Sequence, residues 1–278
     1  MILVTGATGN AGGDVACMLI SAGQEVRGLI RRADQQAILP KGVEGVIGDL
    51  NQPETLSAAL AGVQGVFLLS GYQDMPGLMA ELRRAGVERI VLLSGSSAPI
   101  GDMSNAVTRY MVRSETAVRE SGVPWTILQP NSLMSNAFRW LPQLRVGNVV
   151  RLPFPTVRVA AIDPADIGAV VTQVLSSKEH EGRSYRLSGP QSLLPSDQVR
   201  SLAQVLGRDL RFEGLLDAEA KAEMSTEMPT EYVDAFFSFF VDGKLDESQV
   251  LSTVQEITGK QPRTFEQWAV AHADAFNR

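Results

Sequence analysis

The chain is poor in the residues that build disulfides and metal centres. It contains one cysteine, Cys17, and two histidines, His180 and His272, in 278 residues. A single thiol cannot form an intrachain disulfide, and two isolated histidines lack the spacing of a metal-ligand set. We therefore expect neither a disulfide framework nor a metal site.

Basic charge and long apolar runs are also scarce. The formal net charge is −6, and neighbouring arginines occur only as pairs, so nothing in the chain suits the phosphate backbone of a nucleic acid. No apolar run reaches the roughly 18 residues of a membrane span. No basic segment with a cleavage site stands before the first apolar residues. These absences predict a cytoplasmic protein that binds neither nucleic acid nor membrane.

Short apolar runs alternate with helical patterns over the first 130 residues. The runs are rich in valine, isoleucine and leucine, as in strands that helices cover on both faces. They are Ile2–Thr5, Glu25–Arg31, Val43–Ile47, Val66–Ser70, Arg89–Ser94 and Trp125–Gln129. Between them, apolar residues recur three and four positions apart and several segments end in glycine, which is typical of helices. This alternation predicts an α/β fold with a Rossmann-type, doubly wound parallel sheet.

The pattern loosens after Gln129, where residues 131–158 mix asparagine, proline and aromatic residues with short apolar runs. The recognisable later segments are two helices, Asp163–Ser176 and Pro195–Gly207, one strand, Ser184–Ser188, and a mostly helical stretch over 217–278. We expect a dinucleotide-binding domain over residues 1–131 and a smaller, mostly helical substrate part over 132–278. Within the second part, residues 160–188 are expected to return to the sheet.

The sharpest motif directly follows the first expected strand and reads Thr-Gly-Ala-Thr-Gly-Asn-Ala-Gly-Gly. The residues of a dinucleotide site here would be Gly6, Thr8, Gly9, Asn10, Ala11 and Gly12. Gly6 allows the tight turn, Gly9 lets the backbone approach a pyrophosphate, and Gly12 lets the helix pack on the sheet. The amides of Asn10 and Ala11 would then face the phosphate from a helix N-terminus. The alternative is a loop that no longer binds a nucleotide.

The end of the second expected strand indicates which dinucleotide is bound. NAD-binding proteins usually place an acidic residue there, about 20 residues beyond the glycines. This chain has Arg31 and Arg32 instead, and arginine suits a 2′-phosphate through paired, charge-assisted hydrogen bonds. We therefore predict NADP(H) as the cofactor, against the alternative that both arginines are ordinary surface charges.

Four segments together resemble a known family. They are the glycine loop, the arginine after the second strand, Gly48-Asp49-Leu50 after the third, and Trp125-Thr126-Ile127-Leu128-Gln129-Pro130. In these the chain resembles the atypical short-chain dehydrogenases of the NmrA-like group, which includes NAD(P)H:quinone reductases and redox-sensing regulators. The resemblance covers most of the chain and is strongest over residues 1–135 and 160–169.

The resemblance implies further contacts with the cofactor. It places Asp49 and Leu50 beside the adenine, Leu69, Ser70 and Gly71 beside the ribose and nicotinamide, and Gln129, Pro130 and Asn131 at the closed end near the nicotinamide. These placements agree with the rule that ligands lie at the C-terminal ends of parallel strands. From the residues alone, Asp49 could instead cap a turn, and Ser70 could be a turn residue.

The catalytic pair of the wider dehydrogenase superfamily is missing. That superfamily uses a tyrosine acid with a lysine four residues later, because a free tyrosine has a pKa near 10 and must be brought closer to neutral. None of the four tyrosines has such a lysine. By spacing, the tyrosine and lysine positions fall near Val107 and Met111, which are apolar. Reduction of a ketone by the usual proton relay is therefore not expected.

The remaining catalytic candidates are Ser94, Tyr110 and Asn131. Ser94 fills the serine position at the end of the fifth strand, and Tyr110, between two arginines, could be a displaced acid. The alternatives are a plain strand-end serine and a tyrosine whose ring packs on the core. A site without a strong acid suits a quinone, because hydride transfer to a quinone makes an anion that is already stable in water.

Polar and aromatic side chains gather in the second part of the chain. The candidates for the substrate pocket are Ser96, Ser132, Met134, Phe138, Trp140, Phe154 and Phe236. Phe236 belongs to a segment with four phenylalanines in five positions, in a chain that is only 6% aromatic. Such a helix must cover the core, another subunit or a flat aromatic ligand, and core packing is the simplest alternative.

Three functions fit these observations. The first is an NADP(H)-dependent oxidoreductase acting on a quinone or polyaromatic small molecule, with a homodimer as one possible assembly. The second is a non-catalytic sensor of NADP(H) of the NmrA type, and only this function requires a protein partner. The third is a related oxygenase acting on an aromatic polyketide. We expect the first, because polar anchors and aromatic residues follow Pro130 as in a pocket.

Overall fold

The computed structural model describes residues 1–277 and is built around one parallel sheet. Seven strands follow the order β3-β2-β1-β4-β5-β6-β8, and all neighbouring pairs are parallel. The strands are β1 (Ile2–Val4), β2 (Val26–Ile30), β3 (Glu44–Ile47), β4 (Gly65–Leu69), β5 (Arg89–Leu93), β6 (Trp125–Pro130) and β8 (Arg183–Leu187). The central strands are buried along almost their whole length. The predicted Rossmann-type, doubly wound sheet is thus confirmed.

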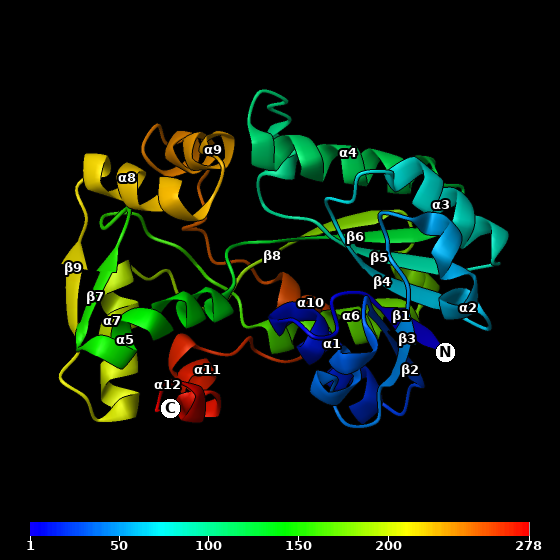
Figure 1. Ribbon diagram of the computed structural model, residues 1–278, viewed down its shortest axis with the longest axis horizontal. Coiled ribbons are helices and arrows are strands. Elements are labelled where there is room, and N and C mark those ends of the chain that lie inside the picture. Colours follow the sequence, from blue (N-terminus) through cyan, green and yellow to red (C-terminus); the bar gives the residue numbers. More distant parts are fainter. Residues whose placement is uncertain (278) are drawn as a thin grey trace.

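Helices cover both faces of this sheet (Figure 1). One face carries α2 (Ser57–Leu60), α3 (Met75–Arg84) and α4 (Ala106–Glu120), and the other carries α1 (Asn10–Ser21), α6 (Pro164–Ser176) and α10 (Thr253–Thr258). Each face has its own hydrophobic cluster, because strands covered on both sides must bury apolar residues in both directions. Helix α10 packs against α6 and β8. A short C-terminal segment therefore lies beside residues 160–188, which contribute α6 and β8 to the main sheet layer.

Side-chain caps fix where the helices beside the sheet begin. Asp163 accepts a hydrogen bond from the backbone amide of Ala165 at 2.8 Å, and Pro164 follows it at the first helical position. Asn105 accepts from the amides of Val107 and Thr108 at the start of α4. Such caps satisfy amides that have no partner within the helix.

The remaining elements form a smaller lobe beside the sheet. They are α5 (Leu141–Val146), β7 (Val149–Leu152), α7 (Pro195–Leu206), β9 (Arg211–Gly214), α8 (Asp217–Glu227), α9 (Thr230–Phe240), α11 (Phe265–Ala271) and α12 (Ala273–Phe276). The core shared by α5, β7, α7, β9, α11 and α12 is an aromatic cluster around Trp268, which is fully buried against Phe138, Phe265 and Phe276. Helix α9 packs instead on α4. Burial of large aromatic side chains gives this lobe a core of its own.

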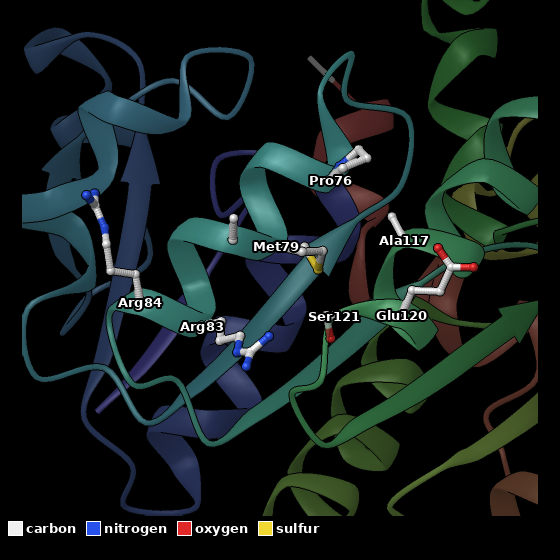
Figure 2. Close-up of a pocket in the computed structure, with 8 residues that line it drawn as sticks. Pro76, Met79, Arg83, Arg84, Ala117, Glu120 and Ser121 are labelled. Carbon is white, nitrogen blue, oxygen red and sulfur yellow. The ribbon is translucent and has the colours of Figure 1, made fainter.

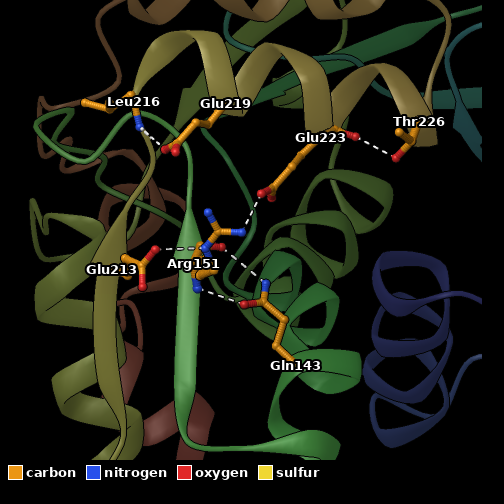
Figure 3. A network of polar contacts seen from close by, with 7 residues as sticks. All are labelled: Gln143, Arg151, Glu213, Leu216, Glu219, Glu223 and Thr226. Carbon is orange, nitrogen blue, oxygen red and sulfur yellow. Dashed lines mark hydrogen bonds and ion pairs between the residues drawn. The ribbon is translucent and has the colours of Figure 1, made fainter.

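The strands β7 and β9 were not expected from the sequence. They pair in parallel, with Val150 opposite Phe212, although about 60 residues separate them in the chain. Figure 3 shows how Arg151 of β7 reaches Glu213 of β9 at 2.9 Å and Glu223 of α8 at 2.6 Å. Gln143 also bonds both backbone groups of Arg151. A two-stranded sheet is marginal alone, and here it packs on the aromatic lobe.

The helices of residues 1–277 are too short or too polar to cross a membrane.

A cluster of acidic groups joins the C-terminal segment to α6. Arg263 forms an ion pair with buried Asp163 at 3.1 Å, and its backbone amide donates to Asp166 at 2.8 Å. Burial raises the pKa of Asp166 to about 6, and the nearby carboxylate of Asp163 adds to the rise. Asp166 is therefore neutral in mildly acidic solution and is forced to ionise inside the fold at higher pH.

We expect Asp166→Asn to stabilise the protein at pH 8 by about 1–3 kcal/mol, the free energy that corresponds to this pKa shift. Asparagine keeps an acceptor for the amide of Arg263 but never ionises. The pKa of Asp166 is higher in the folded than in the unfolded protein. The contribution of Asp166 to the free energy of unfolding is therefore greatest below about pH 4 and is lost as the pH rises through about 6. Urea unfolding near pH 5 and pH 8 measures the difference, and equal pH dependences in both proteins would contradict it.

Candidate active site

Two cavities open at the C-terminal edge of the main sheet. The first, of about 270 Å³, lies between the glycine loop and the ends of β2 and β3. The second, of about 340 Å³, lies at the ends of β5 and β6 and is closed by α4, α9 and the segment around Glu247. Ligands of open parallel sheets bind at this edge, so these two cavities form the candidate site.

Two glycines of the loop have little room for a side chain. Gly6 has a φ of +64°, and a Cβ atom there would lie 2.6 Å from Leu69 Cδ1. A Cβ atom on Gly12 would lie 2.3 Å from the carbonyl oxygen of Gly6, so α1 packs directly against the turn. These contacts give the physical reason for glycine at both positions.

The same loop leaves a helix N-terminus ready for an anion. Gly9 is the N-cap of α1, and no side chain caps this helix. The amides of Asn10 and Ala11 donate to no atom of residues 1–277. Unpaired amides at the positive end of a helix dipole bind phosphate. The loop, including Thr8 on the cavity wall, therefore fits a dinucleotide pyrophosphate.

The two predicted arginines have different surroundings. Arg31 lines the first cavity, and its guanidinium has no ion-pair partner within residues 1–277. Arg32 is instead held in a two-point contact by Asp34, at 3.0 and 2.8 Å. Gln35 accepts from the backbone amides of both arginines. Of the pair, Arg31 is the one that lines the first cavity.

The far wall of the first cavity comes from the turn after β3. Asp49 and Leu50 both line it, and the carboxylate of Asp49 accepts from the amide of Asn51 at 2.9 Å. Asp49 therefore also has the turn-capping role that the sequence left open. Tyr72 lines the same cavity, and burial raises its pKa. We did not predict Tyr72, although it directly follows the predicted segment at the end of β4.

The segment after β4 lies between the two cavities. The side chain of Leu69 packs at Gly6, and the amide of Ser70 donates to the carbonyl of Leu93 at 3.2 Å. Gly71 has a φ of +99°, and a Cβ atom there would lie 3.3 Å from the Tyr110 ring. A side chain at Gly71 would therefore press against Tyr110 at the wall of the second cavity.

Two buried polar atoms in the wall of the second cavity lack partners. The hydroxyl of Ser94 and the side-chain oxygen of Asn131 make no hydrogen bond with residues 1–277. Pro130 lies beside them, and Asn131 uses its amide nitrogen to bond the carbonyl of Glu247 at 3.0 Å. Both atoms are almost fully covered by their neighbours, and unsatisfied buried polar atoms are costly.

Helix α4 presents Val107, Tyr110 and Met111 to the second cavity. Met111 fills the space above Gly95, where a Cβ atom would lie 2.5 Å from its methyl carbon. Burial and the neighbouring Tyr232 raise the pKa of Tyr110. A lysine beside a catalytic tyrosine would lower the tyrosine pKa, so the rise at Tyr110 is in the opposite direction.

Glu247 is the residue of the second cavity that we did not foresee. Its carboxylate accepts from the hydroxyls of Ser96 at 2.5 Å and Ser132 at 2.6 Å, and from the amide of Ser132 at 3.1 Å. Burial raises its pKa. Nothing in the local sequence marks Glu247, because it comes from a segment expected to be mostly helical.

The structure separates the predicted pocket residues into two groups. Ser96, Ser132 and Phe236 line the second cavity, whereas the other four do not. Met134 and Phe138 belong to the aromatic core, Trp140 lines a neighbouring cavity of about 240 Å³, and Phe154 packs on Phe237 and Phe240. Spacing after Pro130 could not show this, because the chain turns there into irregular short helices.

Gln129 also differs from expectation. Its amide donates to Glu115 of α4 at 2.8 Å, and both side chains are buried. Along a strand, alternate side chains point to opposite faces of the sheet. The side chain of Gln129 is therefore engaged with α4 and is absent from both cavity walls.

A larger groove, of about 560 Å³, lies elsewhere between α3 and α4 (Figure 2). Arg83, Arg84, Glu120 and Ser121 line it near the C-terminal ends of these helices. The groove also runs along α3 back to Pro76. None of the residues that line it lines either cavity of the candidate site.

Comparison with known proteins identifies the family. A family model described as NAD(P)H-binding matches residues 6–178. The chain belongs to this NAD(P)H-binding family. The matched residues include the glycine loop, both arginines and the ends of β4, β5 and β6.

The full chain is similar to named reductases of this family. It is 39% identical to the (4-alkanoyl-5-oxo-2,5-dihydrofuran-3-yl)methyl phosphate reductase of Streptomyces griseus subsp. griseus, over 99% of both chains. It is 34% identical to the NAD(P)H azoreductase of Xenophilus azovorans, again over 99% of both. The fold matches the NADPH-dependent quinone oxidoreductase of Escherichia coli with a TM-score of 0.79 at 22% identity, covering 99% and 100% of the two chains. The chain is an NAD(P)H-dependent oxidoreductase, and the resemblance to the NmrA-like group is confirmed.

Proposed function

We propose that this family member transfers hydride from NADPH to a quinone or a related conjugated acceptor bound in the second cavity. The observation that carries this proposal is the composition of that cavity. Apolar and aromatic side chains of α4 and α9 form one wall, and the polar residues Ser94, Asn131 and Ser132 line the other. Such a cavity suits a flat acceptor with carbonyl oxygens.

The first cavity would hold the adenosine half of the cofactor. The amides of Asn10 and Ala11 would bind the pyrophosphate, Arg31 the 2′-phosphate, and Leu50 the adenine. When bound, NADPH supplies a hydride from its dihydronicotinamide ring. The preference for NADPH over NADH rests on Arg31, because no acidic residue at the end of β2 is available for a free ribose hydroxyl.

The acceptor class follows from the proton chemistry. We propose that Val107 and Met111 occupy the positions of the superfamily's tyrosine and lysine, so the site lacks that acid pair. A simple ketone becomes a strongly basic alkoxide when it accepts hydride and therefore requires a strong proton donor. A quinone yields an anion that is stabilised by conjugation, and proximity in a dry cavity supplies much of the acceleration.

A second acceptor is favoured by the relative of 39% identity. The compound in its name contains a carbon–carbon double bond conjugated to two carbonyl groups. Hydride addition to such a bond also gives an anion spread over oxygen atoms. The same cavity could therefore bind and reduce either acceptor, the quinone or the conjugated furanone. An acylated dihydrofuranone is the alternative substrate class.

We expect calorimetry to detect NADPH binding, and menadione added afterwards to oxidise the cofactor, which loses its nicotinamide absorbance. Cyclohexanone, which lacks conjugation, should react at least ~10²-fold more slowly, the scale of general-acid catalysis. Binding without oxidation by menadione or by an acylated dihydrofuranone would instead indicate the NADP(H) sensor. The absence of binding would contradict the oxidoreductase proposal and bring the oxygenase forward.

A further inference from the structure

A buried carboxyl group lies where the site lacks its usual acid. Glu247 is only 5% exposed, yet it belongs to the lining of the second cavity. It comes from the segment between α9 and α10, which in Figure 1 runs from the smaller lobe to the main sheet. Two hydrogen bonds hold the backbone of Glu247 in place. Its carbonyl accepts from the side-chain amide of Asn131 at 3.0 Å and from the backbone amide of Ala160 at 2.7 Å.

The surroundings of this carboxyl group are polar but supply no ion pair. Within residues 1–277 its hydrogen-bond donors are two serine hydroxyls and one backbone amide. The ionisable groups around it are Arg186 of β8, Asp246 of its own segment, Tyr110 of α4 and Tyr232 of α9. Arg186 favours the carboxylate, but desolvation outweighs it and raises the pKa. A buried glutamate is an expensive structural residue, which points to a chemical use.

The two serines connect this group to the cavity. Ser96 is buried and Ser132 is half-buried, and both line the cavity. When Glu247 is protonated, its own O–H donates to one serine oxygen. The hydroxyl hydrogen of that serine is then free to turn toward a ligand, which makes a proton relay between the carboxyl group and the acceptor.

We propose that Glu247 is the proton donor of the reaction and that Ser132, the more exposed serine, passes its proton to the acceptor. This inference rests on the proposed function. Hydride from NADPH carries an electron pair to the acceptor, whose oxygen becomes anionic. That oxygen takes the hydroxyl proton of Ser132 as the serine oxygen takes the proton of Glu247. Glu247 is left as a carboxylate and regains a proton from water.

The test compares Glu247→Gln with wild type, using menadione and NADPH. Glutamine keeps acceptor and donor atoms for both serines but carries no transferable proton. We expect kcat to fall by about 10-fold, less than the full effect of general-acid catalysis because the quinone anion is itself stabilised by conjugation. The solvent deuterium isotope effect on kcat should also be reduced. Wild-type kcat should also decline on the alkaline side as Glu247 ionises, and the variant should lack this decline. Ser132→Ala should lower kcat by at least about 10-fold while Glu247 remains in place.

Glu256→Gln is the matched control. Glu256 also accepts a serine hydroxyl, from Ser252 at 2.5 Å, but it is exposed on α10 and lines neither cavity. We expect this variant to keep the wild-type rate and pH profile. Thermal unfolding of all variants separates a chemical effect from a loss of structure.

A second measurement needs no turnover. Carbon-13 NMR of protein labelled at glutamate carboxyl groups, without cofactor, should show one resonance that titrates above the ordinary glutamate range and vanishes in Glu247→Gln. A Glu247 that is ionised throughout the range would overturn the relay, as would an unchanged kcat and pH profile in Glu247→Gln. A loss of rate confined to Tyr110→Phe would assign the acid to Tyr110 instead. Failure of wild type to reduce either menadione or an acylated dihydrofuranone would reject the proposed function itself, and the relay with it.

Discussion

Replacing Gly12 by alanine is expected to weaken NADPH binding strongly and to destabilise the fold. The new Cβ atom would lie 2.3 Å from the carbonyl oxygen of Gly6 and 2.7 Å from that of Thr5. Both neighbours are backbone atoms of the loop that must hold the pyrophosphate, so relief requires α1 to move away from the sheet. We expect a loss of about 2 kcal/mol or more in the free energy of unfolding and at least about 10²-fold in Kd.

Gly13→Ala gives a matched control within the same helix. Its Cβ atom would meet the carbonyl oxygen of Ala7 at 3.4 Å, close to ordinary contact. Alanine is favoured over glycine inside a helix by up to about 1 kcal/mol. Urea unfolding and NADPH calorimetry on both variants test the comparison. Equal behaviour of the two variants would show that the close packing of Gly12 is not required.

Arg31→Ala is expected to weaken NADPH binding by about 10- to 10²-fold and NADH binding by less than about threefold. The loss corresponds to one or two charge-assisted hydrogen bonds to the 2′-phosphate, which NADH lacks. Calorimetric titration with each dinucleotide measures the ratio. A higher salt concentration should reduce the difference in NADPH affinity between wild type and Arg31→Ala, because salt screens exposed charges.

Arg32→Ala removes the same charge from the next residue. Asp34 already holds the Arg32 guanidinium at two points, so we expect a smaller loss of NADPH affinity than for Arg31→Ala. Equal losses of NADPH and NADH in Arg31→Ala would remove its proposed role. A larger effect at Arg32 would transfer that role to its neighbour.

The candidate site was predictable where function depends on local backbone geometry. The glycine loop, the arginines after β2 and the turn at Asp49 and Leu50 lie at ends of parallel strands, so their shared edge follows from strand order alone. The directions in which side chains point were harder to predict from the sequence. Gln129 and Phe138 stand near the right positions in the chain, but their partners, Glu115 and Trp268, come from distant segments.

The sequence by itself determined the doubly wound sheet, the glycine loop and the arginine at the end of β2, because apolar periodicity and glycine stereochemistry act over a few neighbouring residues. Only the tertiary structure decided the pairing of β7 with β9 and the place of Glu247 between Ser96 and Ser132. Those contacts join residues about 60 to 150 positions apart. They form because packing the smaller lobe against the sheet brings these segments together, and no local pattern records which distant partner a side chain will meet.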